Sequence, residues 1–271
     1  MLIYAIFDGY FILSLFKVFG HIMLKKERQS LILREINIHN KVLLSDIGSK
    51  FHVSDDTVRR DLQELADADK IIKVRGGALS KSYQVYSYKE HEIYAYQEKT
   101  IIARKAISLL RDGMFILISG GSTNLEIARI LPPELKATFI TVSLTTAMQL
   151  QEHPNSETIF LGGRLSKTAR IAVGGAVVAQ LLDLKPDLCF IGTNAIDADM
   201  GLMDSDWEVV SVKKAMIQSA RHVVSLTISE KLNSAQKIKI AGLDEIDTLI
   251  TELDEDHELL VPYRETGIRV I

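Results

Sequence analysis

Between residues 114 and 251, short apolar runs alternate with segments of helical periodicity. This alternation restricts the possible folds more than any other feature of the 271-residue chain. Runs with strand character begin at Met114, Thr138, Thr158, Leu188 and His222. Strands that are apolar on both faces predict a parallel sheet that helices cover on both sides. We therefore expect an α/β open-sheet domain in the C-terminal part of the chain.

The first of these strands ends in Ser119-Gly120-Gly121-Ser122-Thr123 and continues into a helix. Ligands of open α/β sheets bind beyond the carboxyl ends of the strands. Glycines let the backbone approach an anion, and the amides at a helix N-terminus point toward it. The loop is therefore a candidate phosphate site, or else a tight turn in which Ser122 caps the helix. Its spacing fits neither a Walker loop nor a dinucleotide fingerprint, which argues against a nucleotide ligand.

Later strand ends carry further positions that we expect near the same ligand. They are Ser143, Gly162, Gly163, Asn194 and Asp197. Asn194 and Asp197 can hydrogen-bond the hydroxyls of a sugar, although such residues also shape turns. Arg164 and Arg170 can either meet an anionic ligand or remain solvated.

The segment before the sheet predicts a compact helical unit. Ser54 is a candidate N-cap, and Val58, Leu62 and Leu65 form one apolar face at helical spacing. Shorter helical segments precede this helix within residues 25–51. Helices joined by a turn as short as His52-Val53 form a helix-turn-helix arrangement.

Polar side chains on this helix and in the following hairpin predict DNA contacts. Ser54, Thr57, Arg59 and Arg60 occupy the first turns, where a recognition helix meets base edges in the major groove. Residues 71–78 predict a β-wing whose Lys73 and Arg75 can touch phosphate or the minor groove. A surface helix and a plain hairpin with solvated charges are the alternatives. The order of the elements favours DNA binding.

The motif Ser54-x-x-Thr57-Val58-Arg59-Arg60-Asp61-Leu62 and the wing at residues 74–78 resemble the DeoR-type bacterial transcriptional regulators. The resemblance continues through nearly all of the remaining chain. It implies an N-terminal winged helix-turn-helix, mostly α with a β-wing. An α/β open-sheet domain resembling ribose-phosphate isomerase-like folds is expected to follow and to bind a phosphorylated sugar. The resemblance also implies that Lys213 faces this ligand, with Lys214 outside the site.

Two positions depart from the pattern of the family. Val142 stands where family members usually have asparagine, and Ala195 stands where they usually have glycine. The first departure removes one polar contact expected for the usual ligand.

The expected function is that of a cytoplasmic regulator, a repressor of a sugar or polyol catabolic operon that acts as a homo-oligomer on operator DNA, without a cofactor. The alternatives are a sugar-phosphate isomerase-like enzyme, for which Asp197, Asp204 or Glu208 would supply a base, and a membrane-tethered regulator. Scattered histidines without a HExxH motif predict no metal site. The single cysteine, Cys189, excludes an internal disulfide. A net charge of -3 excludes generic binding of polyanions.

The expected boundaries are an apolar extension at residues 1–22, the DNA-binding domain at 23–80, a linker at 81–98 and the sensor domain at 99–271. The extension could be a membrane anchor, a signal peptide or the product of a mis-called start, with Met23 as the true first residue. We favour the last interpretation. The linker holds five of the eight tyrosines, which could pack one domain or one subunit on another.

Overall fold

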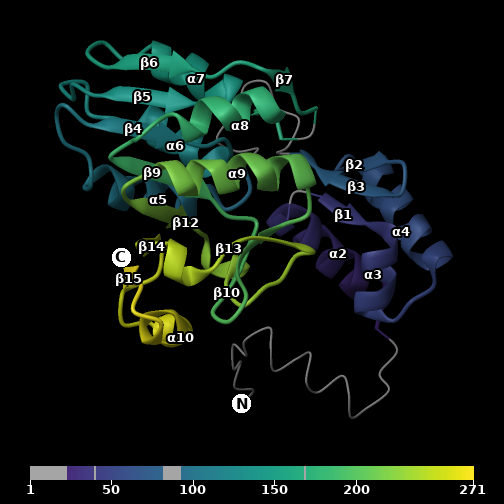
Figure 1. Ribbon diagram of the computed structural model, residues 1–271. Coiled ribbons are helices and arrows are strands. Elements are labelled where there is room, and N and C mark those ends of the chain that lie inside the picture. Colours follow the sequence, from purple (N-terminus) through teal and green to yellow (C-terminus); the bar gives the residue numbers. More distant parts are fainter. Residues whose placement is uncertain (1–22, 40, 82–92, 168) are drawn as a thin grey trace. The chain divides into compact units, whose positions relative to one another are not determined.

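The computed structural model describes residues 23–39, 41–81, 93–167 and 169–271 (Figure 1). The chain divides into two compact units. The first contains residues up to Leu79 apart from 37–40, and the second contains 37–40 and 80–271. The predicted extension at residues 1–22 and most of the predicted linker lie outside the described residues.

The first unit is a winged helix-turn-helix, as the sequence predicts. Its elements are α2 (Lys25–His39), β1 (Lys41–Leu43), α3 (Leu44–Phe51), α4 (Asp55–Asp67), β2 (Ile71–Val74) and β3 (Gly77–Ser80). The three strands form one sheet in the order β1-β3-β2. Ile32 and Ile36 of α2, Val58 and Leu62 of α4, and Ile71 of β2 are at most 3% exposed and form its core. The predicted apolar face of α4 is thus the face that packs.

The turn between α3 and α4 depends on two local features. His52 ends α3 in the left-handed conformation at φ 53°, and its amide donates to the carbonyl of Gly48. Ser54 then caps α4, because its hydroxyl accepts from the amide of Thr57 at 3.3 Å. This confirms the predicted cap. Asp55 and Asp56 follow in the first turn, where acidic side chains suit the helix dipole.

The second unit is a parallel α/β domain. Its seven-stranded sheet has the order β15-β14-β12-β9-β4-β5-β6. The strands are β4 (Phe115–Ile118), β5 (Thr138–Thr141), β6 (Glu157–Phe160), β9 (Leu188–Gly192), β12 (Val223–Leu226), β14 (Thr248–Ile250) and β15 (Arg269–Val270). Every described pairing within this sheet is parallel. The predicted architecture is therefore confirmed.

Helices cover both faces of the sheet (Figure 1). They are α5 (Tyr96–Ile107), α6 (Ser122–Arg129), α7 (Leu144–Gln151), α8 (Gly175–Leu182), α9 (Trp207–Ser219) and α10 (Val261–Glu265). Successive residues of β4 enter different cores: Leu117 packs in the cluster that includes α8 and α9, whereas Ile116 and Ile118 pack in the cluster that includes α5 and α6. This alternation explains why the strands are apolar throughout.

Small elements extend the carboxyl side of the sheet. β10 (Ala195–Asp197), β11 (Gly201–Asp204) and β13 (Ile238–Ala241) form an antiparallel sheet, and β7 (Arg164–Leu165) pairs with β8 (Ala172–Val173). A short 3-10 helix, η3 (Ser229–Lys231), follows β12. The helix predicted from Lys99 starts earlier, because α5 begins at Tyr96.

Candidate functional site

The strand order of the large sheet marks one position for a ligand. From β4 the chain moves outward to β5 and β6, and it then returns to β9 on the other side of β4 before continuing to β12, β14 and β15. The connections that follow β4 and β9 therefore leave the sheet in opposite directions. Open α/β sheets bind ligands at such switch points, beyond the carboxyl ends of the strands.

The loop after β4 has the geometry that the glycines predicted. Gly121, at φ 104°, is the N-cap of α6, and no side chain caps this helix. Ser122 is consequently the first residue of α6 and not its cap. A Cβ on Gly120 would lie 2.7 Å from Cγ2 of Ile171, so a larger residue would displace the loop. The loop thus presents the backbone of α6 at the switch point.

Three lysines lie close enough to interact electrostatically, and one of them bonds the residue that follows β9, the strand next to β4. Lys213 of α9 is 8% exposed, and its Nζ donates to Oδ2 of Asp204 at 2.9 Å. Lys231 of η3 donates to the carbonyl of Thr193, just beyond β9, at 2.8 Å. Lys99 of α5 is also 8% exposed and donates to the carbonyl of Tyr94. Lys231 and Lys99 therefore have neutral carbonyls as hydrogen-bond partners.

Burial lowers the pKa values of Lys231 and Lys99. Burial, followed by repulsion from Lys99 and Lys213, lowers the pKa of Lys231 to about 7, even though Asp204 and Glu230 act in the opposite sense. Part of the Lys231 side chain reaches the surface, but its ammonium group is desolvated. Burial also lowers the pKa of Lys99 to about 8, against the attraction of nearby carboxylates.

Asp204 is the carboxylate that opposes this cluster. Burial acts to raise its pKa, but the charge of Lys213 and several hydrogen bonds together outweigh burial and lower it. Hydrogen bonds from Lys213, the Ser205 amide and Asn194 also lower the pKa, so the group is held as a carboxylate. A carboxylate bound in this way is a poor general base, because its proton affinity is reduced.

Buried polar groups lie in β12, just beyond β9 and β12, and on α6. The hydroxyls of Thr193 and Ser225 lie 2.7 Å apart, and that of Thr227 lies 3.2 Å from Ser225. Asn124 donates to the carbonyl of Gly120 at 2.9 Å, but its Oδ1 has no hydrogen-bond partner among the described residues. A buried acceptor without a donor costs free energy until a ligand or water supplies one.

The structure brings together some of the predicted ligand residues. Ser119 to Thr123, Asn194 and Lys213 all lie at the switch point or next to its lysines. Ser143 lies beside Gly120, with its hydroxyl capping α7 through the amide of Thr146 at 3.3 Å. Ligand roles for these residues stay predictions.

Other predicted ligand residues have clear structural uses. Asp197 accepts from the amides of Asp199 and Met200 and shapes a turn. Gly163 allows a close approach, because a Cβ there would lie 2.5 Å from Cγ2 of Val177. Gly162 precedes it, in the connection that follows the edge strand β6. Arg164 pairs with Glu208, one of the three carboxylates considered as a general base in the sequence. A ligand role for Asp197, Gly162 and Gly163 is still a prediction.

Sequence reasoning missed Lys231, Lys99 and the role of Asp204. Lys231 stands five positions after β12, at the carboxyl edge of the sheet where ligands bind, so its position in the sequence indicates a possible ligand contact. Lys99 offered none, because it precedes the sheet and resembles any lysine on a helix. Val142, expected to remove one polar contact with the usual ligand, is fully buried in the hydrophobic core.

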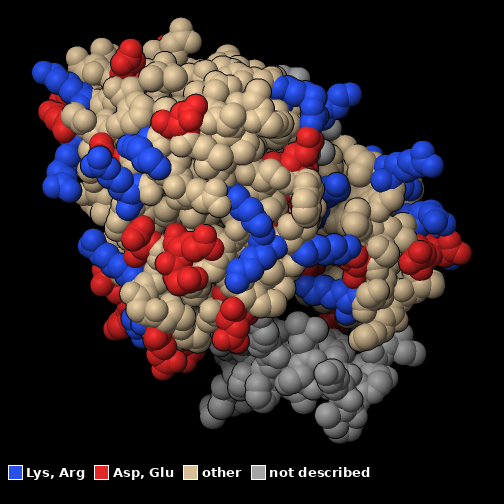
Figure 2. All heavy atoms as spheres, in the orientation of Figure 1, with Lys and Arg blue, Asp and Glu red and all other residues tan. Residues whose placement is uncertain are grey.

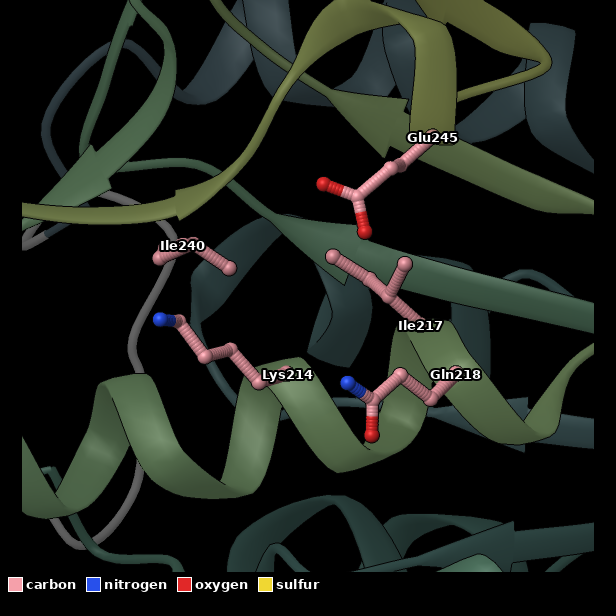
Figure 3. A pocket seen from close by; sticks show the side chains of 5 residues that line it. All are labelled: Lys214, Ile217, Gln218, Ile240 and Glu245. Carbon is pink, nitrogen blue, oxygen red and sulfur yellow. The ribbon is translucent and has the colours of Figure 1, made fainter.

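A small pocket lies elsewhere, between α9, β13 and the following 3-10 helix (Figure 3). Its volume is about 140 Å³, and its lining residues are Lys214, Ile217, Gln218, Ile240 and Glu245. Lys214 is exposed and lines this pocket, whereas its neighbour Lys213 is buried against Asp204. The two adjacent lysines of α9 therefore lie in different environments, one buried and one exposed.

The first unit carries the predicted DNA-binding residues on α4 and the wing. Ser54 and Thr57 lie in the first turn with their hydroxyls 2.9 Å apart, and Arg60 is exposed one turn later. Arg59 is exposed and pairs with Asp56 at 2.7 Å. Lys and Arg side chains on this unit are interspersed with acidic ones (Figure 2).

The wing is tied to the same helix. Lys73 donates to Oε1 of Gln63 at 2.7 Å, and Arg75 is exposed at the end of β2. Behind α4, Arg28 of α2 pairs with the buried Asp61 at 2.6 Å. This pair fixes α4 on the unit while its other face remains accessible.

Each of the two units matches a known protein family. Residues 94–253 match the DeoR C terminal sensor domain, and residues 28–84 match the DeoR-like helix-turn-helix domain. This chain belongs to the DeoR family of transcriptional regulators. Members of the family are regulators and not enzymes, so the isomerase-like alternative is not supported.

Curated relatives span nearly the whole chain. The HTH-type transcriptional repressor GlcR of Bacillus subtilis is 34% identical over 232 residues, which are 85% of this chain and 89% of that protein. The HTH-type transcriptional regulator GlpR of Haloferax volcanii is 28% identical and covers 92% and 98% of the two chains. The glycerol-3-phosphate regulon repressor of Escherichia coli is 26% identical and covers 85% and 92%.

Among solved structures, a D-ribose-5-phosphate isomerase in complex with phospho-erythronic acid aligns with a TM-score of 0.37 and 18% identity. The alignment covers 49% of this chain and 52% of the isomerase. Within the described residues of the regulator, no helix has the length and apolar character to cross a membrane. Among these described residues, no three or more His, Cys, Asp or Glu side chains are placed so that together they could hold a metal ion.

Proposed function

We propose that this regulator is a repressor of a sugar or polyol catabolic operon and that it responds to a phosphorylated sugar. The observation that carries the proposal is the cluster of Lys99, Lys213 and Lys231, in which Lys99 and Lys231 donate to neutral carbonyls. Burial lowers the pKa of Lys99 and of Lys231, so a phosphate bound beside them would stabilise their charged forms. The printed names of relatives agree, since one is a glycerol-3-phosphate regulon repressor and another a putative aga operon repressor.

The phosphate would bind at residues 119–123, where the amides of α6 and the nearby lysines complement its charge. Asn194 and the unpartnered Oδ1 of Asn124 would face the hydroxyls of the sugar. Such hydroxyls supply the donor that Asn124 lacks and an acceptor for the amide of Asn194. A ligand with both a phosphate and hydroxyls satisfies the site better than phosphate alone.

Operator DNA would bind to Ser54, Thr57, Arg59 and Arg60 of the recognition helix and to the wing. Lys73 and Arg75 of the wing would contact the backbone or the minor groove. We expect Arg60→Ala to weaken operator binding at matched salt with little effect on folding, because Arg60 is exposed. Unchanged binding would remove Arg60 from the interface. Because the regulated DNA lies in the cytoplasm, we place the protein there.

The proposal includes a homo-oligomer of this chain, because helix-turn-helix regulators read paired half-sites with two heads. The edge strand β6 supports this, since Ile159 and Phe160 on it are 38% exposed and Met148 on the adjacent α7 is 62% exposed. An open apolar edge favours pairing with a second copy. Light scattering should give a smaller species for Ile159→Asp than for the wild type. The control, Val261→Asp, also replaces an exposed apolar residue and should leave the size unchanged.

The effector is tested by calorimetry on the full chain with glycerol 3-phosphate, hexose 6-phosphates, the free sugars and inorganic phosphate. We expect saturable binding of a phosphorylated sugar and a rise in melting temperature with it. Lys213→Met should weaken this binding at least about tenfold, because it removes a buried cation near the phosphate. Lys214→Met is the matched control and should bind as the wild type does. Binding confined to unphosphorylated compounds, or to none of the panel, would refute the proposal.

A further inference from the structure

Tyr94, in the described part of the predicted linker, is hydrogen-bonded to the turn that carries Lys231. The hydroxyl of Tyr94 donates to Glu230 at 2.7 Å from one carboxylate oxygen and 2.8 Å from the other. Glu230 directly precedes Lys231 in η3. The two partners are 136 positions apart in the sequence, so this bond joins the start of the sensor unit to its ligand site.

The same tyrosine also holds a second lysine of the cluster. Lys99 donates to the backbone carbonyl of Tyr94, and its Nζ lies 5.9 Å from the centre of the tyrosine ring. Lys99 and Lys231 are close enough to repel one another. Tyr94 therefore contacts the surroundings of both lysines, one through its hydroxyl and Glu230 and the other through its carbonyl.

The backbone next to Tyr94 is strained. Ala95 is the N-cap of α5 in the left-handed conformation, at φ 52° and ψ 48°, with no side-chain capping bond. A residue with a Cβ occupies this region at a cost of about 1–3 kcal/mol and stays there only when its surroundings hold it. The contacts of Tyr94 supply that restraint on one side of Ala95. Loosening them allows the entry into α5 to relax.

We propose that Tyr94 couples occupancy of the lysine cluster to the conformation at the N-terminus of α5, and through it to DNA affinity. The proposal rests on the proposed function, since it assumes that an anionic effector binds at these lysines. An arriving phosphate attracts the ammonium groups of Lys99 and Lys231 away from the carbonyls that they now bond. Tyr94 then loses a donor to its carbonyl, and Glu230 moves with Lys231. The strained entry into α5 thereby has one arrangement without effector and another with it.

The test uses Tyr94→Phe in the full chain, which keeps the ring and removes only the hydroxyl. Tyr96→Phe is the matched control, because the hydroxyl of Tyr96 donates at 3.2 Å to Glu126 on α6. Effector affinity is measured by calorimetry with the phosphorylated sugar that the wild type binds most tightly in the panel above. DNA affinity is measured by fluorescence anisotropy with a fragment selected for tight binding to the wild type, with and without that sugar.

We expect Tyr94→Phe to bind each ligand alone within about twofold of the wild type. The factor by which the sugar changes DNA affinity should fall at least about fivefold, because coupling is a quantity separate from either affinity. Tyr96→Phe should keep the wild-type factor. Glu230→Ala should reproduce the loss, and the double variant with Tyr94→Phe should lose no more than either single variant.

An unchanged factor in Tyr94→Phe would overturn the coupling role and leave the proposed function intact. A loss of both affinities together with a lower melting temperature would assign Tyr94 a merely structural role and also overturn it. If the wild type binds no phosphorylated sugar, or binds one without any change in DNA affinity, the proposed function and the coupling fall together.

Discussion

Raising the pH from 7 to 9 should weaken effector binding strongly, because it removes protons from the lysine cluster before the effector arrives. Burial, followed by repulsion from Lys99 of α5 and Lys213 of α9, lowers the pKa of Lys231 to about 7, against the attraction of Asp204 of β11 and of the neighbouring Glu230. The second pKa of a phosphate ester is about 6, so the ligand itself stays a dianion over this range. The change in affinity therefore reports on the protein.

The expected size follows from the fraction of molecules with a charged lysine. With a pKa of about 7, Lys231 is about half protonated at pH 7 and about 1% protonated at pH 9. If only the protonated form binds, Kd rises about 50-fold between these values, which is about 2.3 kcal/mol. Lys99 has a pKa of about 8, so Kd rises about a further tenfold if Lys99 must also be charged for the effector to bind.

Titration calorimetry at pH 7, 8 and 9 and constant ionic strength measures this change. At pH 8, in buffers of different ionisation enthalpy, binding should take up about 1 to 1.5 protons, since Lys231 is mostly neutral and Lys99 about half neutral before binding. Lys231→Met should bind more weakly at pH 7 and show a much flatter pH profile. A wild-type Kd that changes less than about threefold, without proton uptake, would refute the assignment of these lysines to the site.

Three further predictions concern stability and are checked by thermal or urea unfolding. Ser54→Ala removes the cap of α4 and should destabilise the first unit by about 1 kcal/mol, and a change below about 0.3 kcal/mol would contradict the capping role. Arg28→Ala leaves the buried carboxylate of Asp61 without its cation and should lower the free energy of unfolding by about 3 kcal/mol. Arg59→Ala removes an exposed ion pair with Asp56 and should lower it by under about 1 kcal/mol. Equal losses in the two variants would refute this contrast. Gly201→Ala should destabilise the second unit by at least about 2 kcal/mol, because Gly201 has a φ of 81° and an added Cβ would lie 2.1 Å from the carbonyl oxygen of Ala241. A variant that melts at the wild-type temperature would exclude that clash.

The sequence by itself determined the features that depend on near neighbours along the chain. The Ser54 cap, the apolar face of Val58 and Leu62, and the glycine turn at Gly120-Gly121 each involve residues within a few positions of one another. Helix periodicity and turn chemistry act over that same range, so they are visible in the sequence. The alternation of apolar strands and helices likewise determined the parallel sheet, because a strand buried on both faces has no polar side.

Only the tertiary structure decided which strand ends meet and which charges they bring together. Alternation does not say that the chain passes from β6 back to the far side of β4, and that return creates the switch point. Lys99, Lys213 and Lys231 come from three separate elements, and each resembles an ordinary surface lysine in the sequence. Burial lowers the pKa values of Lys99 and Lys231, and packing gives all three lysines their hydrogen-bond partners. These properties arise only when distant segments pack together.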